Sequence, residues 1–311
     1  MADEFLEKVK AQFATGNYAE VIEEWGVDTS NSHDFKQNAY KDYQCRTQDV
    51  IVTTYPKSGT TWMKQIAVQI GYLGDGEYDH IDDVVPWPDK LVPIVCPELN
   101  DISMLSDSPT GVHVIKSHLE AEYIPHETGV KCICVIRDPK DTLVSVVHFE
   151  NGFNKLLFNH TVPVKEWVAA FQTDRFIYQP WALLTDSWWR LKDRDNVLIM
   201  FYEDMKKDLQ GTVRQVADFL QVELTEEQFN KVIEKSSFSY MKANDDKFAP
   251  PAWDAGHVPM VRSGKSGNAK ELLSTESQLQ IDEFCMREFE KLGSTFPYRE
   301  RYALKSQESA P

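Results

Sequence analysis

The 311-residue sequence contains no unbroken apolar stretch close to the roughly 18 to 20 residues that a membrane span needs. Its first eight residues are acidic and amphipathic, and they lack the basic start, apolar run and small-residue cleavage site of a secretory signal. These two absences predict a cytoplasmic protein that does not interact with a membrane.

Positive charge is also scarce, because 33 Lys and Arg residues face 49 Asp and Glu residues, for a formal net charge of −16. Proteins that bind nucleic acid over a broad surface usually present a basic face to the phosphates. The sequence therefore predicts no nucleic-acid partner. An anionic ligand would have to meet a local cluster of cations.

Cysteine is sparse, and the five residues are odd in number and without a repeating spacing. This usage is typical of free thiols in a reducing compartment. Cys132 and Cys134 lie two apart in the apolar run at residues 130–136, so both side chains face one side of a strand and are expected in the core. No spacing resembles a ligand cluster, and no metal is predicted.

The order of apolar segments predicts an α/β fold. Four short β-rich runs are expected to form buried parallel strands, at residues 49–55, 112–117, 130–137 and 196–202. Helical periodicity is found at residues 4–14, 60–73, 141–151, 164–173, 180–192, 209–220, 226–235 and 276–292. The alternation predicts a doubly wound parallel sheet flanked by helices. We expect a single domain over residues 1–311, with a short flexible tail from about residue 303 to 311.

One long segment, residues 244–270, has little periodicity and is rich in proline and glycine. An irregular stretch of this length in a compact domain is usually a functional lid or a disordered insertion. Its end carries Arg262 and Lys265 among small residues, which suits wrapping around an anion. Composition alone leaves open a mobile exposed loop.

The run Lys57-Ser58-Gly59-Thr60-Thr61 lies where the first strand turns into a helix. Backbone N–H groups and the positive end of the helix dipole can converge there on an oxyanion, while the lysine adds a mobile charge. The glycine lets the backbone approach closely, and the threonine hydroxyls can cap the helix or bind oxygens. The run is P-loop-like, but it is not Gly-x-x-x-x-Gly-Lys-Ser/Thr, since its only glycine follows the lysine. An ordinary capped helix start is the alternative.

The octapeptide Tyr-Pro-Lys-Ser-Gly-Thr-Thr-Trp at residues 55–62 closely resembles the 5′-phosphosulfate loop of the cytosolic sulfotransferase family. Further family motifs follow in the same order through nearly the whole chain. The resemblance implies transfer of a sulfuryl group from 3′-phosphoadenosine 5′-phosphosulfate (PAPS) to a hydroxyl of a small phenol, steroid or alcohol. The products would be a sulfate ester and 3′,5′-bisphosphoadenosine (PAP).

The resemblance also implies a set of donor-binding residues. Residues 135–141 with Ser145 resemble the family's strand and helix for the 3′-phosphate, although Arg137 alone would equally fit a surface salt bridge. Trp62 and Phe238 would sandwich the adenine, although plain core packing is the alternative for each aromatic. The implied set is Lys57, Ser58, Gly59, Thr60, Thr61, Trp62, Arg137, Ser145, Tyr202, Ser236, Ser237, Phe238, Met241, Arg262, Ser263 and Gly264.

Lys116-Ser117-His118-Leu119 ends the second predicted strand and resembles the family segment that provides the catalytic base. Parallel sheets bind ligands at the carboxyl ends of their strands, so the segment is expected near the loop. The resemblance implies that His118 takes the acceptor proton, while Lys57 and Lys116 stabilise the charge on the departing bisphosphate. A lone histidine would otherwise be assigned a structural role.

The sequence departs from the family in the possible lid, residues 244–270. The usual Arg-Lys-Gly followed by Gly-Asp-Trp-Lys is replaced, since Ser263 stands for the lysine and residues 267–270 read Gly-Asn-Ala-Lys. Binding of the 3′-phosphate by this segment is then expected to weaken or to shift to Lys265. The family's short dimerisation motif is not recognisable at residues 271–280, which leaves a monomer or a homodimer without that motif.

Other features are assigned to packing or to the solvated surface, among them Trp87 between two prolines and the pair Asp82 and Asp83. No residue selects an acceptor, although residues 84–93 lie where relatives shape that pocket. Two rival functions remain. An ATP-dependent small-molecule kinase is disfavoured by the missing Gly-x-x-x-x-Gly-Lys loop, whereas a non-catalytic nucleotide-binding relative is favoured by the altered lid.

Overall fold

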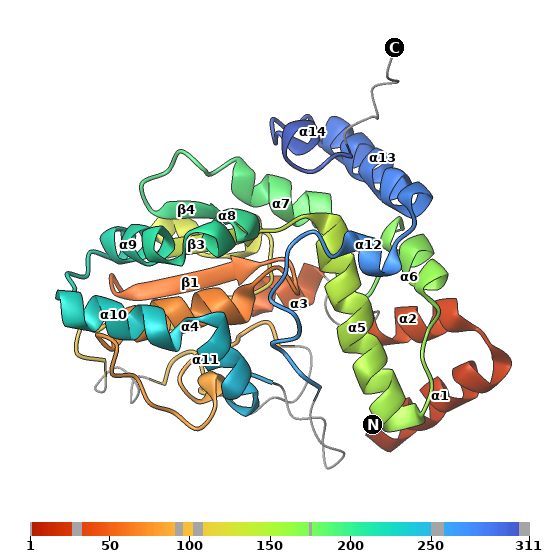
Figure 1. The fold of residues 1–311 in the computed structure, drawn as a ribbon, viewed down its shortest axis with the longest axis horizontal. Helices are drawn as coiled ribbons and strands as arrows, with labels where there is room; N and C mark the ends of the chain where they lie inside the picture. Colours follow the sequence, from red (N-terminus) through yellow and green to blue (C-terminus); the bar gives the residue numbers. More distant parts are fainter. Residues whose placement is uncertain are drawn as a thin grey trace. The chain divides into compact units, whose positions relative to one another are not determined.

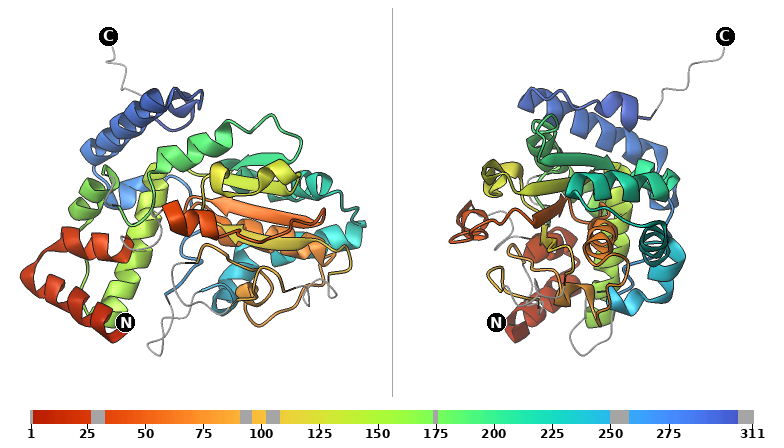
Figure 2. Two further views of the ribbon diagram at one scale, coloured as in Figure 1. Left: turned by 180° about the vertical axis from the view of Figure 1, so that it is seen from behind. Right: turned by 90° about the vertical axis from the view of Figure 1, so that its left-hand side faces the viewer.

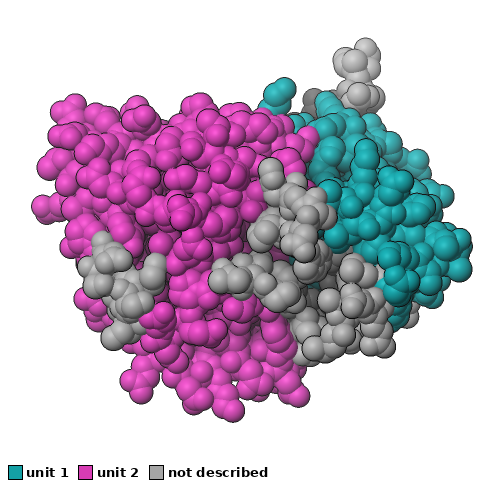
Figure 3. Space-filling model, turned by 90° about the horizontal axis from the view of Figure 1, so that it is seen from below, with its two compact units in different colours: residues 1–31, 138–190, 265–311 teal, residues 32–137, 191–264 magenta. Residues whose placement is uncertain are grey.

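The computed structural model describes residues 2–26, 33–90, 96–101, 108–173, 176–249 and 258–304 (Figure 1). The chain forms two compact units (Figure 3). Unit 1 comprises residues 1–31, 138–190 and 265–311, and unit 2 comprises residues 32–137 and 191–264. Both units are assembled from separate stretches of the sequence. That the whole chain forms one domain stays a prediction.

Unit 2 is built on a four-stranded parallel sheet in the order β2-β1-β3-β4. Its strands are β1 (Asp49–Thr54), β2 (His113–Ser117), β3 (Lys131–Ile136) and β4 (Val197–Phe201). The sheet grows outward from β1 in both directions, and the order reverses between β1 and β3, which is where doubly wound sheets bind ligands. The predicted strands and the doubly wound arrangement are confirmed.

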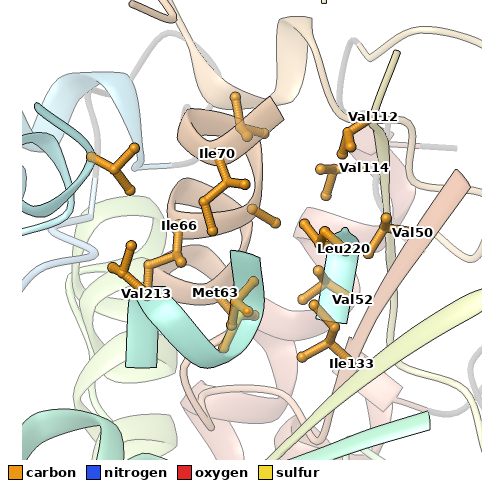
Figure 4. Close-up of a cluster of buried hydrophobic side chains, with 14 of the residues drawn as sticks. Val50, Val52, Met63, Ile66, Ile70, Val112, Val114, Ile133, Val213 and Leu220 are labelled. Atoms are coloured by element: carbon orange, nitrogen blue, oxygen red, sulfur yellow. The ribbon is translucent and has the colours of Figure 1, made fainter. Parts of the chain in front are cut away.

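Helices α4 (Thr60–Gly71), α9 (Leu209–Leu220) and α10 (Glu226–Lys235) pack together along one face of this sheet (Figures 1 and 2). Every residue of β1 is buried, as expected for a central parallel strand. The core between the sheet and these helices is aliphatic (Figure 4) and includes Val50, Val52, Met63, Ile66, Ile70, Val112, Val114, Ile133, Val213 and Leu220. This packing fixes the start of α4, and with it the loop that precedes the helix.

Short elements of unit 2 escaped the sequence analysis because six or fewer residues show no clear helical period. The short helices are α3 (His33–Asn38), α8 (Tyr202–Lys207) and α11 (Phe238–Ala243), and the 3-10 turns are Ile81–Asp83, Ala121–Tyr123, His126–Thr128 and Asp245–Lys247. The last turn lies within the predicted irregular segment, whose residues 250–257 lie outside the described residues.

The regular secondary structure among the described residues of unit 1 is helical, with no strand. Its helices are α1 (Ala2–Thr15), α2 (Tyr18–Gly26), α5 (Pro139–Phe158), α6 (Val164–Phe171), α7 (Trp181–Trp189), α12 (Ala269–Leu272), α13 (Thr275–Leu292) and α14 (Tyr298–Arg301). Helix α5 begins at a proline after the capping side chain of Asp138. It runs past the predicted end at residue 151, because Asn154 and Phe158 continue its buried face.

A buried carboxylate anchors the end of the described chain in unit 1. Asp282 accepts hydrogen bonds from Lys140 Nζ at 2.5 Å, from the Tyr298 hydroxyl at 2.7 Å and from Leu304 N at 2.8 Å. The flexible tail predicted from about residue 303 to 311 stays a prediction. Residues 305–311 lie outside the described residues. Among the helices of the described residues, none is long and apolar enough to cross a bilayer.

Candidate active site

The turn from β1 into α4 has the backbone of an anion-binding loop. Lys57 has a φ of 68° and Gly59 has a φ of 107°, so two residues of this short turn are in the left-handed region. Such alternation turns successive N–H groups toward one side, and a positive φ at a lysine is uncommon outside functional turns. Gly59 is the N-cap residue of α4 and has no side chain that could cap the helix. The first N–H groups of α4 are thus suited to an oxyanion.

Gly59 is also required by close packing. A Cβ atom at this position would lie 2.8 Å from Cδ2 of Tyr202, which follows β4. The Tyr202 ring contacts the Trp62 ring edge to face, with centroids 5.6 Å apart. Its ring also stacks on Arg137, whose guanidinium carbon lies 4.5 Å from the Tyr202 centroid. Tyr202 and Arg137, from two other segments of the chain, therefore lie beside the loop.

Arg137 lies at the carboxyl end of β3 and forms a hydrogen bond with the loop. Its Nη1 donates to the carbonyl oxygen of Lys57 at 2.9 Å, and the residue is only 7% exposed. Its buried Nε has no hydrogen-bond partner among the described residues. A buried donor of this kind fits a site that binds an anion.

The described end of the predicted lid contacts the loop through Met260. Lys57 Nζ donates to Sδ of Met260 at 3.1 Å. The carboxylate of Asp245 accepts from the backbone N–H groups of Met260 and Val261, and Lys242 Nζ donates to the carbonyl oxygen of Val261 at 2.6 Å. Residues 260–262 are therefore held within unit 2 by side chains from α11 and the turn after it.

The predicted adenine-side residues gather beside α4. Trp62 Nε1 donates to the carbonyl oxygen of Ser236 at 2.8 Å, and the Ser237 side chain caps α11. Phe238 is 45% exposed, and its ring lies against Gly264. Met241, by contrast, is 4% exposed and belongs to the hydrophobic core. The ring that Trp62 contacts is Tyr202, so its pairing with Phe238 about a base stays a prediction.

Ser145 is the one predicted donor residue that falls in unit 1, where it lies partly buried on α5. Another side chain of α5, Asp141, accepts from the backbone N–H groups of Gly267 at 2.6 Å and Ala269 at 2.8 Å. These contacts hold the segment that replaces the family's Gly-Asp-Trp-Lys. The role of Ser145 stays a prediction.

His118 follows β2 and has a defined tautomer. Its Nδ1 lies 2.8 Å from the carbonyl oxygen of Thr54, and a carbonyl can only accept, so Nδ1 carries the proton and Nε2 is the basic nitrogen. Burial and the charge of Lys116 hold the pKa of His118 well below its usual value. The imidazole is therefore neutral at physiological pH, as a general base must be.

Lys116 is held on an indole ring. Its Nζ lies 3.1 Å from the ring centroid of Trp87, and burial together with the charge of Lys64 lowers its pKa to about 7. Trp87 also meets the ring of His118 edge to face, with centroids 5.5 Å apart. The assignment of Trp87 to plain packing was incomplete, since its ring contacts two of the three predicted catalytic side chains, Lys116 and His118.

Asp82 was wrongly assigned to the solvated surface. It is 5% exposed and accepts from Lys64 Nζ at 2.5 Å, whereas the adjacent Asp83 is exposed. Burial alone would raise the pKa of Asp82, but the charges of Lys64 and Lys116 outweigh it and hold the pKa at about 2. Three lysines and two buried carboxylates thus lie close enough to interact around Lys116, at the end of β2. They are Lys57, Lys64, Lys116, Asp82 and Asp89.

Across the part of the chain that the structure describes, no group of three His, Cys, Asp or Glu residues is arranged to hold a metal. Cys132 and Cys134 are buried free thiols, as predicted, and burial raises the pKa of both. Neither is suited to ligation or nucleophilic chemistry.

The chain is similar to proteins of a known family. A family model described as a sulfotransferase domain matches residues 47–295. The chain is 30% identical to sulfotransferase 1 family member D1 of Mus musculus over 269 residues, which covers 83% of this chain and 88% of that protein. It is 30% identical to luciferin sulfotransferase of Photinus pyralis over 301 residues, covering 86% and 79%.

Solved structures support the fold. The crystal structure of mouse sulfotransferase SULT7A1 complexed with PAP has a TM-score of 0.60 at 24% identity and covers 83% of this chain and 89% of that chain. Retinol dehydratase in a complex with retinol and PAP has a TM-score of 0.64 at 21% identity and covers 88% of each chain. The α/β architecture predicted from the sequence is the one that these proteins share.

Proposed function

This chain belongs to the sulfotransferase family, and we propose that it transfers a sulfuryl group from PAPS to a hydroxyl of a small molecule. The supporting observation is the hydrogen bond from Arg137 to the Lys57 carbonyl, which joins the cation after β3 to the anion-binding loop after β1. These are the two strands between which the order reverses, where a doubly wound sheet binds its ligand.

In this proposal the loop binds the 5′ end of the donor. The N–H groups of Gly59, Thr60 and Thr61, the Ser58 side chain and the Lys57 ammonium meet the phosphosulfate, as the left-handed residues of the turn permit. Arg137 binds the 3′-phosphate together with Arg262, Ser263 and Gly264, all of unit 2. The adenine side is formed by Trp62, Tyr202, Ser236, Ser237 and Phe238, with Met241 supporting them from the core.

The chemical step follows from the tautomer of His118. The acceptor oxygen attacks sulfur while the bond from sulfur to the bridging phosphate oxygen breaks, and Nε2 of His118 takes the acceptor proton. Negative charge grows on the departing PAP, where Lys57, Lys116 and the loop N–H groups stabilise it. The proton then leaves the imidazole for solvent, which restores the neutral base.

A donor assay separates this proposal from its rivals. The protein is incubated with labelled PAPS or ATP, with and without magnesium, against phenols, luciferin, steroids and alkyl alcohols. We expect label to pass from PAPS to a hydroxyl without magnesium. Transfer of label from ATP but not from PAPS would identify a kinase. Binding of PAP without transfer from either donor would identify a non-catalytic relative. The proposal also includes a cytoplasmic location and a monomer or homodimer.

The pH dependence of the reaction should report Lys116. Because its pKa is about 7 without donor, its ammonium is lost as pH rises through 7, and kcat/KM for PAPS should fall there. His118 is already neutral, so the pH profile should show no change in rate near the usual pKa of a histidine. Bound donor is anionic and raises the pKa of Lys116, so kcat should hold to higher pH.

Profiles of kcat/KM and kcat between about pH 5.5 and 9 test this expectation. In Lys116→Arg the guanidinium keeps its charge, so the decline in kcat/KM should disappear even if the rate is lower. A wild-type decline that persists in Lys116→Arg would assign it to another group.

The Gly264→Ala variant tests the lid's contact with the adenine side. Gly264 has a φ of 56°, and a Cβ atom there would lie 2.3 Å from two carbons of the Phe238 ring. The ring must move, and we expect PAP affinity to fall by roughly tenfold, as for other overpacked sites.

Gly267→Ala is the matched control, because Gly267 has a φ of 74° and no atom within 4 Å of its Cβ position. It shares the backbone strain without the clash. Calorimetric titration with PAP compares the two variants, and equal losses of affinity would show that strain, not the ring, is responsible.

A further inference from the structure

The short segment of residues 86–89 runs beside the end of β2 and bonds to it at two points. Lys116 N donates to the carbonyl oxygen of Pro86 at 2.9 Å. His118 N donates to Oδ2 of Asp89 at 2.7 Å. The main chain at Lys116 and His118 is thus fixed by one neighbouring segment, at the point where the regular pairing of β2 ends at Ser117.

The side chains of the same segment contact the same two residues. The indole of Trp87 lies under the Lys116 ammonium at 3.1 Å from the ring centroid, and it meets the His118 ring at an interplanar angle of 82°. An ammonium over an indole face is held electrostatically, and the attraction is larger where water is excluded. The edge-to-face contact restricts rotation of the imidazole.

Asp89 is a buried carboxyl, only 3% exposed. Burial raises its pKa to about 6, against the opposing effects of the His118 N–H and the Lys116 charge. A buried acidic group normally costs stability unless it is well paired. Here its partner is the main chain of the proposed base, which makes the carboxylate a support for that residue.

We infer that Trp87 and Asp89 are positioning residues for sulfuryl transfer: Trp87 holds the Lys116 ammonium, and Asp89 holds the main chain that carries His118. The inference rests on the proposed function, since Lys116 and His118 are the groups that it positions. Neither Trp87 nor Asp89 takes part in the bond changes. Their removal should therefore lower kcat while leaving the KM values nearly unchanged.

Paired variants separate positioning from simple loss of a side chain. Asp89→Leu removes the acceptor for His118 N, and we expect kcat to fall roughly 10²-fold. Asp89→Asn keeps an acceptor oxygen, and its kcat should stay within about fivefold of wild type. Trp87→Leu should lower kcat by about tenfold, while Trp87→Phe, which keeps an aromatic face, should restore most of it. Asp83→Asn, which changes an exposed carboxylate three residues before this segment, is the control.

A second measurement does not depend on turnover. In nuclear magnetic resonance of the full chain with ¹⁵N-labelled histidine, the His118 signal is assigned by its loss in His118→Gln. Wild type and Asp89→Asn should show the Nδ1-protonated form, whereas Asp89→Leu should show a mixture of tautomers or exchange broadening. Thermal unfolding confirms that each variant is folded.

The outcomes are distinguishable. Unchanged kcat and an unchanged tautomer in Asp89→Leu would overturn the role of Asp89, as would an Asn variant as slow as the Leu variant. Equal rates in Trp87→Phe and Trp87→Leu would overturn the role of Trp87. If the wild type transfers no sulfuryl group, the proposed function fails, and the imidazole spectra still decide whether Asp89 positions His118.

Discussion

Replacement of His118 by Ala is expected to lower kcat by roughly 10²-fold or more, with PAP affinity nearly unchanged. The side chain carries the basic nitrogen Nε2, which the hydrogen bond from Nδ1 to Thr54 defines. The donor contacts are made by other residues. Initial rates at saturating donor and acceptor, with PAP titration calorimetry, measure both effects.

Ala leaves the Thr54 carbonyl without the Nδ1 donor, next to the start of the loop. His118→Asn is therefore the sharper variant, because its amide N–H can replace Nδ1 but it has no basic nitrogen. It should be as slow as Ala and bind PAP normally. His33→Ala, an exposed histidine of the same unit, is the control. Near-normal turnover in His118→Asn would remove His118 from the mechanism.

The sheet was predictable because its central strands, β1 and β3, are largely apolar runs buried on both faces, which the sequence displays directly. The bounds of α9 and α10 were also correct. Both helices begin at capping side chains, Asp208 for α9 and the Thr225–Gln228 capping box for α10. Signals of this kind are local, so one sequence suffices to read them.

The surroundings of Lys116 and His118 were not predictable in this way. Asp82 and Asp83 are adjacent and chemically identical, yet only Asp82 is buried against Lys64. Trp87 and Asp89 contact residues that lie 29 positions away along the chain, at Lys116 and His118. Burial and such contacts arise from tertiary packing. The loop, by contrast, was found because its residues are contiguous.

Replacement of Arg137 by Ala is expected to weaken PAP binding by roughly 10²-fold and binding of 5′-AMP, its 3′-hydroxyl counterpart, by less than about threefold. The buried guanidinium lies beside the anion-binding loop, and its Nε has no partner among the described residues. A 3′-phosphate would supply the acceptors. Loss of the Arg137 side chain removes a charge-assisted hydrogen bond that only the 3′-phosphorylated nucleotide makes.

The variant has a second consequence, because Arg137 also donates to the Lys57 carbonyl and stacks on Tyr202. Loosening of the loop through these contacts affects both nucleotides alike, so the ratio of the two affinity losses isolates the 3′-phosphate. Arg194→Ala, which breaks only an exposed pair with Glu127, is the control and should change neither affinity. Equal losses for PAP and 5′-AMP in Arg137→Ala would mean that the residue supports the loop without binding the 3′-phosphate.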